Sequence, residues 1–287
     1  KQIDDPPRKL FYKGNVEDEL FGNCLGVVGS RRVTQYGRRV TQDLVFEMAG
    51  RGVIIVSGFM YGVDMIAHET AMASGGKTVA VVAYGVERAC PRYLQGNYDA
   101  ILGSKGVVLS EYGKDEPARK FMFPKRNRII AGLCKAVLVV EAGLGSGSLI
   151  TADYALKYGR KLFMVPGSIY NHNSKGTNEY IKQGKAVVAT CADDVMGVFK
   201  TATEIGVRDV GGAGLEGAGD LVRGLNYSHL KKEQKKIMRC LQKEPLSRDE
   251  LCRSTGIKVA QLNQELTLLI LSGQIKEKEG RYSVNNG

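Results

Sequence analysis

Glycine, serine and charged residues follow the short apolar runs in the first two thirds of the chain. Gly29-Ser30-Arg31 follows the first run, and Ser57-Gly58 ends the second. Ser146-Gly147-Ser148 comes shortly after the fifth. Glycine lets the backbone approach a ligand closely, and the free N–H groups at a helix start attract anions. Serine hydroxyls add hydrogen-bond donors. These loops therefore predict a crevice that binds phosphate groups.

Three cations stand within four residues at the start of a helix predicted over residues 126–134. Lys125, Arg126 and Arg128 occupy positions where the helix dipole disfavours positive charge. An anionic ligand would remove the conflict, since guanidinium groups fit phosphate geometry. The neighbouring Phe121 and Phe123 would then offer rings on which a base can stack. The segment therefore favours a nucleic-acid ligand.

A second interpretation of the same segment needs no ligand. The arginines would pair with Glu111 and Glu141, two acids that follow predicted strands, while the phenylalanines pack in the core. Both interpretations can hold at once for different residues. Asp64 and His68, spaced like an acid–base pair on one helix face, are interpreted as a helix cap and a structural histidine because no nucleophile lies near them.

No cofactor or metal is expected. The six cysteines form no C-x-x-C motif and the three histidines are scattered, so no metal-ligand cluster is visible. Gly75-Gly76-Lys77-Thr78 resembles the end of a P-loop, but it precedes a strand and has Ala71 where the first glycine is required. The dinucleotide spacing G-x-G-x-x-G is missing around Gly29.

The elements that must position these loops alternate along the chain. Continuous Val- and Ile-rich runs predict strands buried on both faces of a parallel sheet, at residues 25–30, 53–58, 78–85, 107–112, 136–143, 161–167 and 186–190. Amphipathic stretches predict helices at 36–51, 64–75, 126–134, 148–159 and 177–184. The alternation predicts a doubly wound, mostly parallel α/β sheet of the Rossmann type. Ligands bind beyond the carboxyl ends of such strands, where the glycine and serine loops fall.

We expect three parts in the chain: a Rossmann-like domain over residues 1–200, a flexible glycine-rich linker over 201–226, and a winged helix-turn-helix domain over 227–287. Three short helices and a hairpin with a turn at Gly280 make up the last part. Its presumed recognition helix, 259–271, contains no Lys or Arg. A protein contact or a weak backbone contact is therefore expected there in preference to reading of a duplex.

The formal net charge of +11 favours a polyanionic partner, although ordinary solubility charge explains it equally well without a site. No apolar run reaches the length of a membrane span, and no leader is apparent, so we expect a cytoplasmic protein without a membrane contact.

Eight segments in order along the chain resemble the DNA-processing protein A (DprA/Smf) family. They lie at residues 5–14, 28–37, 57–68, 75–81, 110–112, 123–133, 137–152 and 165–167, and include V-G-S-R, F-P-K-R-N-R-I-I-A-G-L and S-G-S-L-I-T-A. The chain departs from the family pattern at Tyr61, where arginine is common, at Cys90-Pro91, and at Gly145. These departures put individual pocket contacts in doubt.

The resemblance implies an extended Rossmann fold and a homodimer that binds single-stranded DNA and loads the RecA recombinase on it during natural transformation, without catalysis. The DNA or phosphate contacts expected from the loops and from the resemblance are Gly29, Ser30, Arg31, Ser57, Gly58, Phe123, Lys125, Arg126, Asn127, Arg128, Ser146, Gly147, Ser148 and Thr151. Asp64, Glu111 and Glu141 are expected to organise the pocket.

Two other functions stay open. The loop at Ser146-Gly147-Ser148 resembles that of nucleotide-processing enzymes of the lysine-decarboxylase-like group, although their P-G-G-x-G-T-x-x-E arrangement is missing. The other function is a duplex-specific regulator that acts through the winged helix. It is disfavoured because the recognition helix has no Lys or Arg and includes Glu265.

Overall fold

The computed structural model describes residues 3–16, 21–104, 106–199, 232–241, 244–257, 259–271, 274–278 and 280–284. The chain divides into two compact units, Lys1–Ala213 and Gly214–Gly287. The predicted linker over 201–226 lies outside the described residues. The proposed domain limits at 200 and 227 therefore stay predictions.

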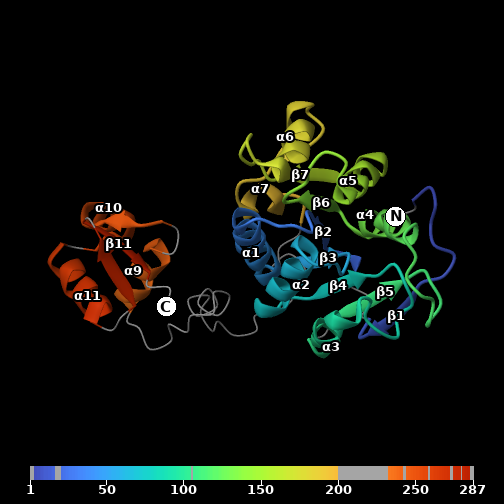
Figure 1. Cartoon of the computed structure of the whole chain (residues 1–287), viewed down its shortest axis with the longest axis horizontal. Coiled ribbons are helices and arrows are strands. Elements are labelled where there is room, and N and C mark those ends of the chain that lie inside the picture. The colour runs from blue at the N-terminus through green and yellow to red at the C-terminus, as the bar shows by residue number, and fades with distance from the viewer. Residues whose placement is uncertain are drawn as a thin grey trace. The chain divides into compact units, whose positions relative to one another are not determined.

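The first unit is built on one eight-stranded sheet with the order β1-β5-β4-β3-β2-β6-β7-β8 (Figure 1). Its strands are β1 Phe11–Gly14, β2 Cys24–Val28, β3 Ile54–Ser57, β4 Thr78–Val81, β5 Val107–Ser110, β6 Ala136–Val139, β7 Lys161–Met164 and β8 Val187–Val188. All neighbours pair in parallel except β1, which runs antiparallel to β5 at the edge. This confirms the predicted mostly parallel Rossmann-like sheet.

Helices cover both faces of the sheet because successive strand residues point to opposite sides and both sets are apolar. On one face α1 (Gln35–Gly50), α2 (Val63–Ala73) and α7 (Ala192–Met196) pack on a core that includes Leu25 and Ile55. On the other, α4 (Met122–Leu133), α5 (Gly147–Lys157) and α6 (Lys175–Lys182) pack on a core that includes Val56 and Val139. Helix α3 (Gln95–Gly103) contributes Tyr98 and Ile101 to a further cluster beside β4 and β5.

Helix α4 begins at Met122, four residues earlier than predicted. The apolar and proline residues at 121–124 hid its start, yet Pro124 fits there because the first turn of a helix needs no N–H donor. The edge strand β1 and the short helices α3 and α7 were not predicted.

The second unit confirms the predicted winged helix. It contains α9 (Lys232–Leu241), α10 (Arg248–Thr255), α11 (Val259–Leu271) and a three-stranded sheet of β9 (Leu246–Ser247), β10 (Ile275–Lys278) and β11 (Arg281–Val284). Ser247 and Glu250 form the predicted capping box at the start of α10. Ile237, Leu251 and Leu262 lie in its own core.

Among the described residues of both units, no helix has the length and apolar character needed to cross a membrane.

Candidate anion-binding pocket

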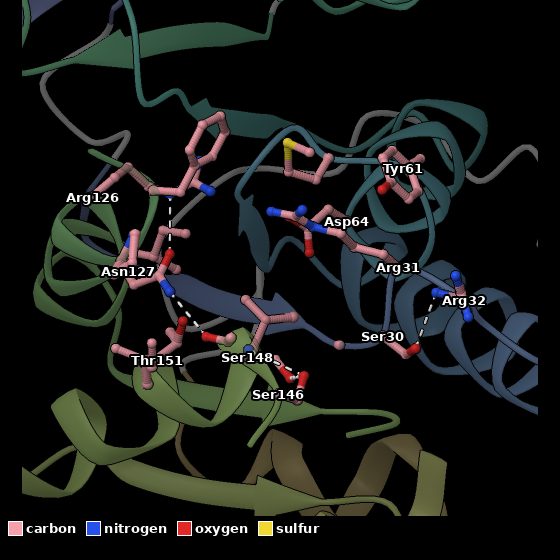
Figure 2. A pocket seen from close by; sticks show the side chains of 18 of the residues that line it. Ser30, Arg31, Arg32, Tyr61, Asp64, Arg126, Asn127, Ser146, Ser148 and Thr151 are labelled. Carbon is pink, nitrogen blue, oxygen red and sulfur yellow. Dashed lines mark hydrogen bonds between the residues drawn. The ribbon is translucent and has the colours of Figure 1, made fainter. Parts of the chain in front are cut away.

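A pocket of about 580 Å³ opens beyond the carboxyl ends of β2, β3 and β6, where the glycine and serine loops were predicted to meet. Residues from several loops and from helices α2, α4 and α5 line it (Figure 2). They are Val28, Gly29, Ser30, Arg31, Arg32, Met60, Tyr61, Asp64, Phe123, Pro124, Arg126, Asn127, Ile130, Ser146, Gly147, Ser148, Ile150, Thr151, His172 and Asn173. The structure thus brings together ten of the fourteen expected contacts, and Asp64 with them.

The N-terminus of α5 forms one end of the pocket. Ser146 caps the helix, and its hydroxyl lies 2.9 Å from that of Ser148. The Asn127 side-chain amide donates to the Gly147 carbonyl at 3.1 Å, which ties α4 to this turn (Figure 2). Because the first N–H groups of a helix lack intrahelical partners and carry partial positive charge, this end suits a phosphate oxygen.

Arg31 occupies the opposite side, between two aromatic rings. Its guanidinium carbon lies 5.7 Å from the centroid of the Tyr61 ring and 5.8 Å from that of Phe123. Arg31 is exposed, and no acidic side chain of the described residues forms an ion pair with it. The rings hold the charge in place by cation–π attraction while its hydrogen-bond donors stay available to a ligand.

Arg126 supplies a second, buried charge. Its Nη1 donates to the carbonyl oxygens of Gly58 and Val81, and its Nε donates to the Asn127 side chain at 3.2 Å. The side chain is 4% exposed, and burial lowers the pKa of its guanidinium while attraction to Asp64 raises it. Arg126 therefore contributes a fixed positive wall to the pocket, and most of its donors are already engaged by protein carbonyls.

Asp64 lies in the first turn of α2 and faces the pocket close to Arg31 (Figure 2). Burial raises the pKa of its carboxyl to about 6, and attraction to Arg126 opposes that shift. Gly58 is required behind it, since a Cβ there would lie 2.6 Å from Asp64 Oδ2 and 2.7 Å from Arg126 Nη2. Ser57 donates to the Val27 carbonyl at 2.6 Å. Gly58 and Ser57 thus shape the pocket from outside and do not line it.

Arg128 and Lys125, both predicted to contact phosphate, do not line the pocket. Arg128 makes a two-pronged ion pair with Glu111, at 3.0 and 2.8 Å, and a third bond to Asp5 at 2.9 Å. Lys125 lies 3.8 Å from the same Glu111 carboxylate. Residues two apart on a helix point in nearly opposite directions, so Arg126 and Arg128 cannot both face the pocket. The ion-pair interpretation therefore holds for Arg128. Glu111, which was expected to organise the pocket, pairs with Arg128 and does not line the pocket.

Glu141 also lies outside the pocket lining. Its carboxylate accepts hydrogen bonds from the Thr34 backbone N–H at 2.9 Å and from the Thr34 hydroxyl at 2.5 Å. Gly37 is needed beside it, since a Cβ there would lie 2.4 Å from the carboxylate. Thr34 is the N-cap of α1. Glu141 therefore fixes the start of α1 after the Ser30–Arg32 loop, and no arginine pairs with it within the described residues.

His68 is a core residue, as predicted. Its Nδ1 lies 2.7 Å from the Thr78 hydroxyl, and burial lowers its pKa to about 3. It does not line the pocket. In the described part of the chain, no group of three or more His, Cys, Asp or Glu side chains is arranged to hold a metal ion.

Sequence reasoning missed four polar or aromatic lining residues, namely Arg32, Tyr61, His172 and Asn173. The last two belong to a short 3-10 helix, His172–Ser174, well beyond the end of β7. The Asn173 side chain donates to the Arg32 carbonyl at 2.6 Å and so fastens this segment to the β2 loop. The run Asn171-His172-Asn173 was the available signal, because turn-forming asparagines often hold loop backbones.

The fold and pocket define a class: a Rossmann-like domain with an anion pocket at the carboxyl edge of its sheet, followed by a winged helix. Residues 1–200 match the family described as DNA recombination-mediator protein A, and residues 226–281 match the DprA winged helix domain. The chain belongs to the DNA recombination-mediator protein A family.

Similar proteins carry the name DNA processing protein DprA or Smf. DprA of Streptococcus pneumoniae is 42% identical over 199 residues, covering 69% of each chain. DprA of Bacillus subtilis is 38% identical, covering 67% of this chain and 65% of its own. Protein Smf of Escherichia coli is 41% identical, and the match covers 67% of this chain and 51% of that protein. The chain thus spans about half to two thirds of the length of these relatives.

Two solved structures resemble the first unit. The crystal structure of Streptococcus pneumoniae DprA has a TM-score of 0.62 at 41% identity, covering 67% of this chain and 66% of its own. A structure of Helicobacter pylori DprA has a TM-score of 0.60 at 33% identity, and the match covers 68% of this chain and 88% of that chain. That structure concerns the single-stranded DNA binding mode of the Helicobacter pylori protein.

Proposed function

We propose that this chain binds single-stranded DNA in the pocket, without strong sequence preference, and loads the RecA recombinase on it during natural transformation. The observation that carries the proposal is Arg31, held between Tyr61 and Phe123 and facing the N-terminus of α5 across one pocket. The negative charge of a phosphodiester backbone complements both Arg31 and the N-terminus of α5. The flat face of an unpaired base can stack on the rings of Tyr61 and Phe123.

The pocket favours single strands because it combines charge with apolar and aromatic surface. Phosphate groups would lie against Arg31, Arg32 and the α5 N-terminus, while a base enters the pocket beside them. Bases of a duplex are stacked and paired, so their faces cannot reach such a pocket without being flipped out. The net charge of +11 and the single-stranded DNA binding mode of the Helicobacter pylori relative support the assignment.

The recognition helix of the winged domain supports a role other than duplex reading. The exposed residues of α11 include Gln261, Gln264, Thr267 and Leu268, and the helix has no Lys or Arg. A major groove is read mainly by charged and amide side chains backed by phosphate contacts. We therefore assign protein contact or weak backbone contact to this domain.

We also propose that the protein acts in the cytoplasm as a homodimer and does not catalyse a reaction. A nucleotide-processing enzyme remains the alternative to test. Release of a free base from AMP at high protein concentration would overturn the non-enzymatic assignment, while its absence under conditions that support DNA binding would agree with it.

Binding anisotropy tests the main proposal. A labelled oligo-dT and a duplex of equal length are titrated with protein at several salt concentrations. We expect tighter binding of the single strand, and affinity that falls steeply as salt rises because phosphate contacts release counterions. Equal affinity for both DNAs, or binding that salt does not weaken, would contradict it. RecA loading is tested by whether the full chain speeds RecA filament formation on the same oligonucleotide.

A further inference from the structure

Asp64 is out of place in a pocket built only for phosphate. It is a carboxylate among lining residues that are otherwise apolar, positively charged or hydrogen-bond donors, and it lies beside Arg31. Two like charges in a poorly solvated site repel each other strongly, so a phosphate group would avoid this position. The ligand group that approaches Asp64 must therefore be neutral or a hydrogen-bond donor.

The N-terminus of α5 and Asp64 lie on different sides of the pocket. Figure 2 shows Ser146, Ser148 and Thr151 gathered on one side, with Asp64, Arg31 and Tyr61 on the other. Val28, Met60 and Ile130 add apolar lining. Apolar surface gains nothing from phosphate, but it favours a flat nucleobase. The volume of about 580 Å³ lies in the range of sites that enclose small organic ligands.

We infer that Asp64 is a specificity-determining residue, whose carboxylate accepts hydrogen bonds from the edge of a nucleobase in the pocket and so gives guanine an advantage at that one position of the strand. The inference rests on the proposed function, and it deepens it by naming the preferred base. The rest of the strand is bound through phosphates and stacking, which do not read sequence.

Guanine is favoured because of what each base presents on its pairing edge. Guanine offers two adjacent donors, N1–H and the N2 amino group, which match the two oxygens of one carboxylate. Adenine and cytosine each offer an amino group next to a ring nitrogen that accepts, and thymine offers one N–H between two carbonyl oxygens. A carboxylate has only acceptors when ionised, so it pairs fully with guanine and meets at least one opposing acceptor in the other three.

Asp64 has acceptor capacity left for a ligand. The Ser57 side chain and the Met60 backbone lie within hydrogen-bonding reach of its carboxylate, and Arg126 Nη2 stands near its Oδ2. No ion pair within 4.0 Å joins it to Arg126 or Arg31 among the described contacts. A carboxylate has about four lone-pair positions, so Asp64, which lines the pocket, can accept from a ligand donor in addition to these contacts. A role as counter-charge for Arg126 alone would not depend on which base is bound, so the two roles separate in a base-substitution experiment.

The test is a set of oligo-dT strands that differ at one central position, titrated at pH 7.5 where the carboxyl of Asp64 is ionised. The position holds dT, dG, deoxyinosine, which lacks the N2 amino group, or 2-aminopurine, which lacks the N1–H. A single guanine avoids folded guanine structures. We expect the dG strand to bind about tenfold more tightly than the deoxyinosine strand, as for one hydrogen bond to a charged group, and both analogues to bind more weakly than dG.

Two variants complete the experiment. In Asp64→Asn the ratio of dG to deoxyinosine affinity should fall to within about twofold of one. Asp193→Asn removes the same charge from an exposed position on α7, outside the pocket, and should leave the ratio unchanged. Equal binding of dG and deoxyinosine by the unmodified protein, or an unchanged ratio in Asp64→Asn, would overturn the inference.

The ratio within one protein does not depend on the fraction that is folded, and the analogue series needs no variant at all. Failure to bind any of the strands would instead overturn the proposed function. Tight binding of all strands with equal affinity would overturn only the base preference.

Discussion

Replacing Arg128 with methionine separates a structural arginine from a ligand-binding one. The side chains of Arg128 and Glu111 are 3% and 9% exposed and are joined by two hydrogen bonds, with Asp5 bonded to the same guanidinium. The substitution keeps the apolar stem and leaves the Glu111 carboxylate buried without its main partner. Removing one member of a buried ion pair costs about 3–5 kcal/mol.

The lower end of that range applies here. Lys125 lies 3.8 Å from the Glu111 carboxylate and offsets part of the lost charge. We therefore expect Arg128→Met to lower the free energy of unfolding by about 3 kcal/mol. With a urea slope of about 2 kcal/mol per M, the midpoint should fall by about 1.5 M in a denaturation curve followed by far-ultraviolet circular dichroism. The added change Glu111→Gln should recover part of the loss, since it removes the uncompensated charge.

DNA affinity supplies the second half of this test. Folded Arg128→Met protein should bind single-stranded DNA as well as the unmodified protein does, because Arg128 faces away from the pocket. A free energy of unfolding within about 1 kcal/mol of that of the unmodified protein would refute the reasoning, because the expected loss is well above that value. Loss of DNA affinity in the folded variant would refute it too.

Three further outcomes follow from other residues. Burial raises the pKa of Asp64 to about 6, so protonation below that pH removes a negative charge from the pocket. Affinity for oligo-dT at fixed salt should therefore rise as the pH falls through about 6. In Asp64→Asn this rise should be absent. Burial lowers the pKa of His68 to about 3, so neutral His68 contributes fully to stability above about pH 6.5. This contribution is lost as the pH falls toward 3. The free energy of unfolding of His68→Gln should therefore fall less over that pH range than that of the unmodified protein. Ser247→Ala removes the cap of α10 and should cost the second unit about 1 kcal/mol, measured by hydrogen exchange of residues 248–255, with the first unit unchanged.

The sequence predicts the sheet well because its strands are buried on both faces. Continuous Val and Ile runs leave little choice of element, and β6 and β7 begin at the predicted residues. Strand β1 carries no such signal, since Tyr12, Lys13 and Gly14 are exposed and Phe11 is half-buried. Its conformation depends on pairing with β5, which no local pattern reveals.

The candidate site was predicted as a place more accurately than as a set of contacts. Carboxyl ends of parallel strands must meet at one edge, so Ser30, Asp64 and Ser148 were brought together by topology alone. Which of Arg126 and Arg128 faces the pocket depends on how α4 packs against the sheet, and the local sequence does not show that packing. Asp5, the partner that helps to hold Arg128, lies 123 residues away in sequence, and local reasoning cannot supply such a pairing.

Arg31 carries the central claim, and a paired substitution tests it most directly. Arg31→Ala removes the exposed cation held between two rings, while Lys161→Ala removes an exposed cation at the amino end of β7, the opposite edge of the sheet. Each variant is titrated with oligo-dT across a range of salt concentrations. We predict that Arg31→Ala binds about tenfold to a hundredfold more weakly and that its salt slope is smaller by about 0.7, as for one lost phosphate contact on a single strand. Lys161→Ala should match the unmodified protein. Equal affinities and slopes for the two variants would contradict the assignment of DNA binding to this pocket.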